Sequence, residues 1–292
     1  MAHNHSHSSE KIGWAFFLNF GFTIIEFIGG WLTNSTAIMA DAVHDLGDTL
    51  SIGSGWVLNK LGGKGADTRF TYGYRRLSLL GALINGIVLL AGSSWILFEA
   101  IPRLADPVMP ETEGMILLAI LGVAVNGFAA FKLQGGKTLN EKVLNWHLLE
   151  DVLGWVAVLI VAIVMQFVAW PILDPLLSIG FTLFILFNVG RNLISTFKLF
   201  FQAAPDNHLP NKVTQAIQKL DFVKSLHHLH IWSLDGEHHV ATAHVVARFE
   251  SIDEYRRLKQ KIAETLEQFE FTHTTIEIEL LEEGCRDTIP ED

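Results

Sequence analysis

Two stretches of the chain place a histidine four residues before an aspartate, His44 with Asp48 and His147 with Asp151. Residues four apart lie on the same face of an α-helix, so each pair can bind one ion from one side. Two such helices facing each other would offer two imidazoles and two carboxylates, a ligand set that Zn²⁺ binds in tetrahedral geometry. The two carboxylate charges would balance the charge of the ion. The spacing therefore predicts a four-ligand metal site.

Both pairs lie within or beside runs that are otherwise apolar. An ionisable side chain is costly in a bilayer, so such residues usually mark an ion path or a substrate site. The alternative, a hydrogen-bonded polar pair between helices, is weaker because the same pair occurs twice at the same spacing. We therefore interpret these four residues as the ligands of a transport site.

Three further polar residues could line an ion path. Asp41 shares a helical face with His44 and Asp48, which makes it a candidate for the outer path or a proton exit. Asn19 and Glu26 lie near one stripe of the preceding apolar run. Either these two residues line the path, or Glu26 holds two helices together, and the sequence favours neither interpretation.

The composition is typical of a membrane protein, since half of the 292 residues are hydrophobic and 18% are charged. Six apolar runs are long enough to span the hydrocarbon core as helices, at about 12–33, 36–58, 77–101, 114–131, 143–168 and 172–197. The expected fold is an all-α six-helix transmembrane bundle followed by a small α+β domain. The single cysteine, Cys285, excludes a disulfide framework and a thiolate cluster within one chain.

After residue 201 the pattern becomes that of a soluble domain. The expected elements are a helix, two strands, a helix and a strand, at 210–220, 226–234, 239–249, 251–268 and 274–281. This order predicts a small α+β sandwich. From residue 206 onward there are 17 acidic and 9 basic residues, so most of the net charge of −10 lies in this domain. An acidic domain argues against a nucleic-acid partner and suits a cation.

The predicted hairpin of the tail domain turns at Asp235-Gly236. A two-residue turn there pairs His227 with His244, with their Cβ atoms about 5 Å apart. We favour a metal site for this pair and ordinary solvated strand faces for the other histidines of the hairpin, His228, His238 and His239. Glu277 and Glu279 share one face of the third strand, with His273 just before it.

Positive charges in the connections predict the orientation. Lys and Arg gather in the N-terminal tail and in the second and fourth connections, whereas the first, third and fifth connections carry only Arg103. Both termini are therefore expected in the cytoplasm, without a cleavable signal. The predicted domains are a His-containing tail at 1–11, a transport domain at 12–202 and a metal-binding, dimerising domain at 203–292. The tail histidines, His3, His5 and His7, either bind metal weakly or form a flexible terminus.

Several motifs together resemble the cation diffusion facilitator family of metal exporters. They are the run 34–48, Thr-Tyr-Gly-Tyr-Arg-Arg at 71–76, the second His/Asp pair, the run 227–234 and Ala-His-Val at 243–245. The resemblance covers nearly the whole chain. It implies a homodimer that exports divalent metal in exchange for protons, needs no cofactor and carries a cytoplasmic ferredoxin-like, metallochaperone-like domain that binds metal at the dimer interface.

By position, the resemblance makes His44, Asp48, His147 and Asp151 the transport ligands and favours zinc, with cobalt or cadmium as alternatives. It also implies that Zn²⁺ is a structural or regulatory ligand of the tail domain. His227, His244 and Glu279 match the metal-binding positions there, and His273 lies within one residue of another. Two features depart from the family: only Asp67 remains of a metal site in the second connection, and Glu277 stands where relatives often have glutamine.

The mechanism that we expect is alternating access. Metal entering from the cytoplasm needs deprotonated ligands, and protons arriving from outside compete for the same groups and favour release. Selectivity for Cd²⁺, Co²⁺ or Fe²⁺ is an alternative, because ligand type alone does not select among these metals. A membrane-embedded metallohydrolase and a passive metal channel are remote alternatives. Compact loops and the size of the chain suggest a bacterial inner membrane.

Overall fold

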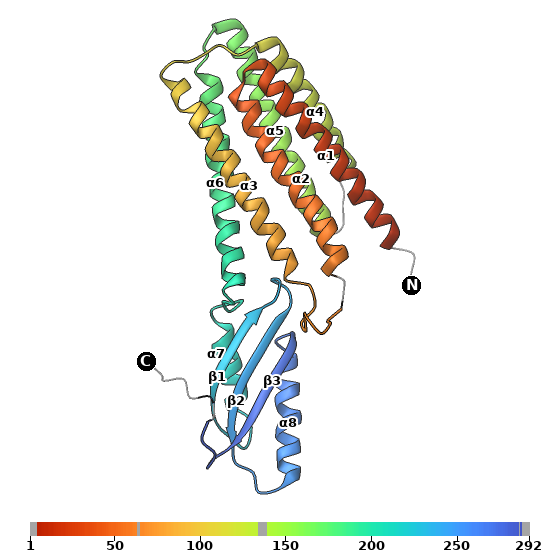
Figure 1. Ribbon diagram of the computed structural model, residues 1–292, viewed down its shortest axis with the longest axis vertical. Coiled ribbons are helices and arrows are strands. Elements are labelled where there is room, and N and C mark those ends of the chain that lie inside the picture. Colours follow the sequence, from red (N-terminus) through yellow and green to blue (C-terminus); the bar gives the residue numbers. More distant parts are fainter. Residues whose placement is uncertain (1–4, 63–64, 134–138, 286, 288–292) are drawn as a thin grey trace. The chain divides into compact units, whose positions relative to one another are not determined.

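The computed structural model describes the backbone of residues 5–62, 65–133, 139–285 and 287. Within these ranges it describes the side chains of residues 16–55, 57–58, 65–131, 148–285 and 287. The chain forms two compact units, 1–61 with 80–193 and 62–79 with 194–292. Figure 1 labels the helices and strands of both units, and we describe each unit by itself.

The N-terminal two thirds of the chain is helical. Its long helices are α1 (His5–Thr33), α2 (Thr36–Gly62), α3 (Leu77–Ala100), α4 (Thr112–Leu133), α5 (Leu139–Val168) and α6 (Leu173–Phe200), with a short 3₁₀ helix at Pro102–Leu104. Among the described residues, five of these helices, all except α2, are long and apolar enough to cross a membrane. Many of their large apolar side chains are exposed, as expected of surfaces that contact lipid tails.

The number of spans differs from the prediction at α2. This helix carries Asp41, Asp45 and Asp48 in its first half, and it is not among the helices that are apolar enough to span a membrane. Five apolar helices establish a multi-pass helical membrane region. The predicted count of six spans depends on α2 and remains a prediction.

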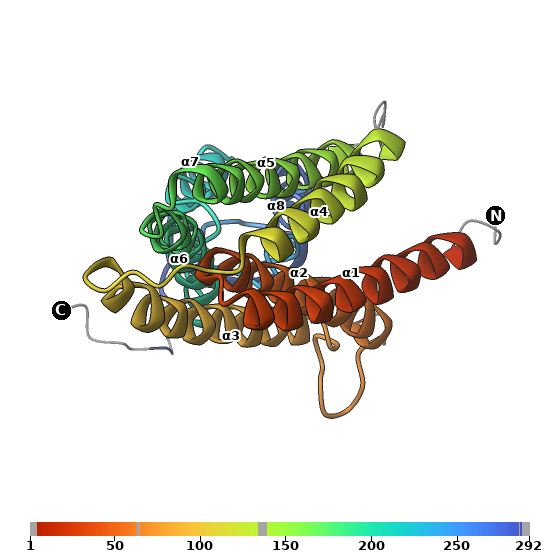
Figure 2. The same cartoon turned by 90° about the horizontal axis from the view of Figure 1, so that it is seen from above.

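The helices α4 and α5 lie side by side (Figure 2). A buried cluster that includes Phe22, Ile38, Met115 and Trp155 joins them to α1 and α2. Gly122 permits the close approach of α4 to α5, because a Cβ atom at this position would overlap the indole ring of Trp155. Such small residues are common where membrane helices pack closely.

A buried carboxylate on α6 fixes the start of α2. Oδ1 of Asp174 accepts hydrogen bonds from the Ser35 hydroxyl at 2.5 Å and the Ala37 N–H at 3.3 Å. Its Oδ2 accepts from the N–H and the hydroxyl of Thr36, at 2.7 and 2.8 Å. These donors include N–H groups at the beginning of α2, which have no acceptor within the helix. Asp174 thus acts as an N-cap supplied by another helix, and a negative charge at this end also suits the helix dipole.

The C-terminal part contains α7 (Leu209–Gln218), β1 (Val223–Ser233), β2 (His239–Ala247), α8 (Ile252–Glu267) and β3 (Phe271–Leu280). The sheet order is β1-β2-β3, with β1 antiparallel and β3 parallel to β2. Both helices pack on the sheet through one apolar core (Figure 1). Ser251 caps α8, because its hydroxyl oxygen accepts the N–H of Glu254 at 3.2 Å. The predicted order of helices and strands is confirmed.

The predicted two-residue turn at Asp235-Gly236 is wrong. Ser233 pairs with His239, and the N–H of Leu234 donates to the carbonyl of His238 at 2.8 Å, which makes a five-residue loop. The loop forms because the Asp235 carboxylate accepts the N–H groups of residues 237 and 238, at 3.0 and 2.8 Å.

The predicted pairing of His227 with His244 is nevertheless confirmed. The longer loop shifts the register by one residue, and an irregularity between His227 and His230 shifts it back. His228, in this irregularity, has a positive φ of 48°, a conformation that is uncommon for a residue other than glycine.

Candidate metal-binding sites

One group of potential ligands lies within the helical unit. The ligand atoms of His44, Asp48 and Asp151 all lie within 4.8 Å of one another. Nε2 of His44 is 3.8 Å from Oδ2 of Asp48 and 3.7 Å from Oδ1 of Asp151. The first two residues are one turn apart on α2, and the third comes from α5, more than a hundred residues away in the sequence. All three side chains are half-buried, so an ion can reach them.

His147, the fourth predicted ligand, lies on α5 one turn before Asp151. Its side chain is outside the described residues, so its part in the site remains a prediction. The helices α2 and α5 are in contact here, since a Cβ atom on Gly154 would lie at an ordinary van der Waals distance, 3.7 Å, from Oδ1 of Asp41. On the other side of α2, a Cβ on Gly47 would lie 2.5 Å from the Leu89 side chain of α3.

The three candidate path residues occupy different environments. Asn19 ties α1 to α2, because its amide donates to Oγ1 of Thr49 at 3.0 Å and to the carbonyl of Asp45 at 3.3 Å. Glu26 is fully buried, and Asp41 is 7% exposed. Asp45, which the helical spacing points away from His44, is also buried.

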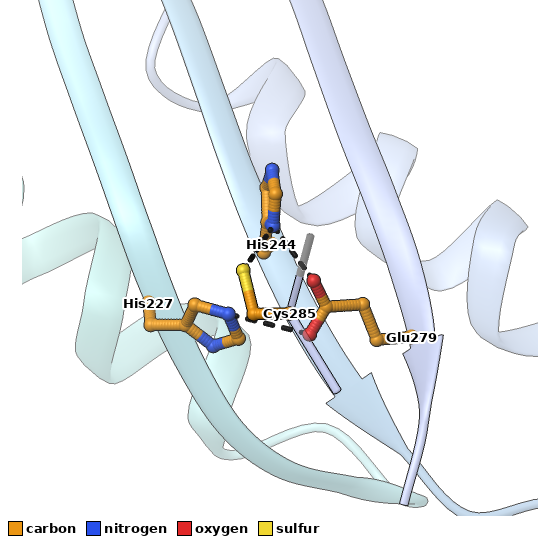
Figure 3. A group of neighbouring side chains, drawn as sticks. All are labelled: His227, His244, Glu279 and Cys285. Carbon is orange, nitrogen blue, oxygen red and sulfur yellow. Dashed lines mark hydrogen bonds and ion pairs between the residues drawn. The ribbon is translucent and has the colours of Figure 1, made fainter. Parts of the chain in front are cut away.

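A second group of potential ligands lies in the C-terminal unit. His227 on β1, His244 on β2, Glu279 on β3 and Cys285 after β3 converge on one point (Figure 3). Their ligand atoms all lie within 4.8 Å of one another. Nδ1 of His244 is 2.7 Å from Oε1 of Glu279, whose Oε2 is 3.2 Å from Nε2 of His227. Two imidazoles, a carboxylate and a thiol form a donor set that zinc can bind.

Further carboxylates surround this group. Nε2 of His244 lies 3.5 Å from Oδ2 of Asp287 and 3.8 Å from Oε2 of Glu277. Partial burial raises the pKa of the Cys285 thiol, and the negative charge of Glu279 raises it further. A divalent ion at this position would offset the negative charge and favour the thiolate, which is the form that binds metal.

Sequence reasoning missed Cys285, because a single cysteine was considered only as half of a disulfide or as part of a thiolate cluster. Its position five residues after the end of β3, the strand that carries Glu279, is the signal that could have found it. The structure does not bring His273 into the group. The ring of His273 instead lies edge-on against Tyr72, with ring centroids 5.2 Å apart.

His228 was predicted on a solvated strand face. The irregularity in β1 turns its ring toward the site, with centroids 5.1 Å from His227 and 5.2 Å from His244. A regular strand would have placed neighbouring residues on opposite faces. His238, by contrast, is bound to the loop, since its Nδ1 lies 2.7 Å from Oδ2 of Asp235.

Comparison with known proteins agrees with this architecture. The family model described as the cation efflux transmembrane domain matches residues 14–201, and that of the cation efflux protein cytoplasmic domain matches residues 205–280. The chain is 34% identical to the "Cadmium, cobalt and zinc/H(+)-K(+) antiporter" of Bacillus subtilis, covering 96% of this chain and 92% of that protein.

Two other bacterial relatives are similar along nearly their whole length. The "Metal cation efflux system protein CzcD" of Cupriavidus metallidurans is 32% identical, over 95% of this chain and 90% of the relative. The "Zinc transporter ZitB" of Escherichia coli is 30% identical, over 96% of this chain and 93% of the relative.

Proposed function

Since this chain belongs to the cation efflux family, we propose that it exports divalent metal ions, Zn²⁺ first among them, in exchange for protons. It is a transporter and not an enzyme. One observation carries the proposal: His44, Asp48 and Asp151 bring their ligand atoms within 4.8 Å of one another from two helices of the membrane region. Three relatives bear names that specify zinc, cadmium, cobalt or metal cation transport, which supports this class of substrate.

The ligand types suit an ion that must be bound and then released. Imidazole and carboxylate hold Zn²⁺ only when they are deprotonated, so protons entering from the opposite side displace the metal. His147 would complete a tetrahedral set from the turn of α5 that precedes Asp151. The metal is then released when the ligands are protonated and the site opens to the other side of the membrane. The site does not need to unfold.

The topology that we propose has α2 as a sixth span, with both termini on the cytoplasmic side of a bacterial inner membrane. Burial of Asp41 and Asp45 supports a transmembrane α2, because these carboxyl groups point into protein and not toward lipid. Residues 1–11 would form a tail, 12–202 the transport domain and 203–292 a cytoplasmic domain that joins two copies of the chain.

The C-terminal domain offers a site for a second metal ion, one that would stay bound to the protein. His227, His244, Glu279 and Cys285 would hold it, and the ion would stabilise the three-stranded sheet from which three of them come. Participation of His273 remains a prediction. It is tested by counting the zinc bound to His273→Ala, which should bind less zinc than the unmodified chain if this histidine is a ligand.

The test of the proposed function is metal flux into proteoliposomes with and without an imposed pH gradient. Zn²⁺, Cd²⁺, Co²⁺ and Fe²⁺ are compared for the unmodified chain, Asp151→Asn and the exposed control Asp106→Asn. We expect zinc flux that needs both the gradient and Asp151 and is unchanged in the control. Flux that ignores the gradient would support a channel, and flux that survives loss of Asp151 would refute the ligand assignment.

A further inference from the structure

Two of the apolar spans end next to each other. The span on α3 begins at Leu77, and the span on α6 ends at Phe200. Nη2 of Arg76, the residue before α3, donates to the carbonyl of Leu199 at 3.2 Å. This hydrogen bond brings the start of α3 to the end of α6, so the two spans leave the hydrocarbon core on the same side.

The charge of Arg75, the residue before Arg76, is not compensated within the described part of the chain. Its side chain is half-buried, and Nη1 of its guanidinium group is buried without a hydrogen-bond acceptor. No described carboxylate forms an ion pair with it. A buried donor without an acceptor is costly. Because the side chain remains partly exposed, an acceptor from outside the chain can reach the guanidinium group.

The acidic residue nearest to Arg75 in the sequence is used by its own loop. Asp67 is the one acidic residue between α2 and α3, and its Oδ1 accepts the N–H groups of Arg69 and Phe70, each at 2.7 Å. Its Oδ2 accepts the hydroxyl of Tyr74 at 2.5 Å. The same connection, residues 63–76, carries four basic residues. It therefore keeps a net positive charge.

Exposed aromatic side chains lie at the same end of the two spans. Phe201, one residue after α6, is 82% exposed and stacks on Phe197, with ring centroids 6.3 Å apart. Phe70 is also exposed, and its ring centroid lies 4.6 Å from that of Tyr74. The last turn of α6 adds an exposed basic residue, Lys198. Exposed apolar rings beside basic side chains are typical of segments that lie at a membrane interface.

We propose that Arg75 binds the phosphate group of an anionic phospholipid at this membrane surface. The planar guanidinium group suits a phosphate, because two of its N–H groups can donate to two phosphate oxygens in parallel. A lipid fits better than a soluble anion, because the exposed rings of Phe70 and Phe201 would contact its acyl chains. An anionic headgroup fits better than a zwitterionic one, because the connection is positively charged. The inference goes beyond the proposed function and does not depend on which metal is exported.

The test counts the lipids that bind to the full chain in detergent, by native mass spectrometry. The chain is titrated with phosphatidylglycerol and, in a parallel series, with phosphatidylcholine that carries the same acyl chains. Arg75→Gln removes the charge, and Arg75→Lys keeps the charge without the pair of parallel donors. Arg257→Gln is the matched control, because Arg257 is exposed on α8, away in the sequence from the connection and from α6. Thermal unfolding shows whether each variant is folded.

The unmodified chain should bind phosphatidylglycerol more tightly than phosphatidylcholine. Arg75→Gln should weaken the tightest phosphatidylglycerol association by about fivefold to tenfold, which is the contribution expected of one basic side chain at an anionic membrane surface. The same substitution should change phosphatidylcholine binding less, because that headgroup has no net charge. Arg75→Lys should have an intermediate affinity for phosphatidylglycerol. Arg257→Gln should bind both lipids as the unmodified chain does.

Three outcomes of the titrations would overturn the inference. They are equal affinity for phosphatidylglycerol in Arg75→Gln and the unmodified chain, an equal loss of affinity in Arg257→Gln, and no preference of the unmodified chain for phosphatidylglycerol. Inorganic phosphate at the concentration of the lipid tests for a soluble anion, and displacement of the lipid by phosphate would also overturn it. If Arg75→Gln does not fold, Arg75→Lys must still bind phosphatidylglycerol more weakly than the unmodified chain, and unchanged affinity would refute the assignment.

Discussion

Asp174→Asn should destabilise α2, the helix that carries half of the predicted transport ligands. The carboxylate of Asp174 is 1% exposed and accepts four hydrogen bonds, from Ser35, Thr36 and Ala37 at the start of α2. An asparagine has one acceptor oxygen in place of two. Its amide nitrogen would face two of these donors and could not accept from either.

The magnitude follows from the bonds that are lost. A hydrogen bond to a charged group contributes about 1.5–3 kcal/mol, so the loss of two amounts to about 3–6 kcal/mol. Rotation of a hydroxyl of Ser35 or Thr36 toward the new amide would recover part of this, which leaves about 3 kcal/mol. At about 2–4 °C for each kcal/mol, the midpoint of thermal unfolding should fall by about 6–12 °C.

The assay is thermal unfolding of the purified protein in detergent, with zinc affinity measured on the same samples. Asp106→Asn, at an exposed position, is the control and should unfold within about 1–2 °C of the unmodified chain. Zinc binding should weaken in Asp174→Asn because His44 and Asp48 lie on α2. An unchanged midpoint in Asp174→Asn would refute the role of Asp174 as a cap of α2.

Three further outcomes are expected. Cobalt bound to the site of His227, His244, Glu279 and Cys285 should show thiolate-to-metal charge-transfer absorption, and Cys285→Ser should abolish this band. The same substitution should weaken zinc binding at this site by about tenfold. Absence of the band in the unmodified chain would remove Cys285 from the ligands. Gly122→Ala should lower the free energy of unfolding by about 1–3 kcal/mol, because the new methyl group overlaps Trp155. In the control Gly127→Ala, the methyl group meets no atom within 4 Å, so this variant should be neutral or stabilising. Equal midpoints of thermal unfolding for the two variants would contradict this packing. Partial burial acts to raise the pKa of Asp235, but hydrogen bonds from two backbone N–H groups and a histidine ring outweigh it and lower the pKa. Its carboxylate therefore contributes stability above the unfolded-state pKa of about 3.9 that is lost as the pH falls through the lower folded-state value. The stability difference between the unmodified chain and Asp235→Asn should shrink between pH 7 and about pH 3, and a constant difference would contradict the bonding of the loop.

The sequence predicted elements whose pattern is local and strong. Helical spacing placed His44 and Asp48 on one face, and the composition of the tail predicted the order of its helices and strands. Local sequence patterns alone could not predict that His44 lies close to Asp151, because this distance depends on how α2 and α5 pack. The repeated His/Asp pair suggested this proximity only because both pairs would have to bind the same metal ion.

The failures have equally specific causes. The Asp235-Gly236 dipeptide suggested a tight turn, but the Asp235 carboxylate binds two N–H groups of a longer loop. Cys285 joins His227 and His244 by a reversal of the chain after β3, which hydrophobic periodicity does not encode. The cap that Asp174 provides to α2 links residues 138 apart in the sequence and was likewise invisible.

The central claim is that His44, Asp48 and Asp151 bind the transported ion, and zinc calorimetry on a chain without the tail site tests it most directly. In a His244→Ala background, the protein should bind one zinc ion tightly, and adding Asp151→Asn should weaken that binding by about tenfold or more. Unchanged affinity and stoichiometry after loss of Asp151 would contradict the claim and place the transported metal elsewhere in the chain.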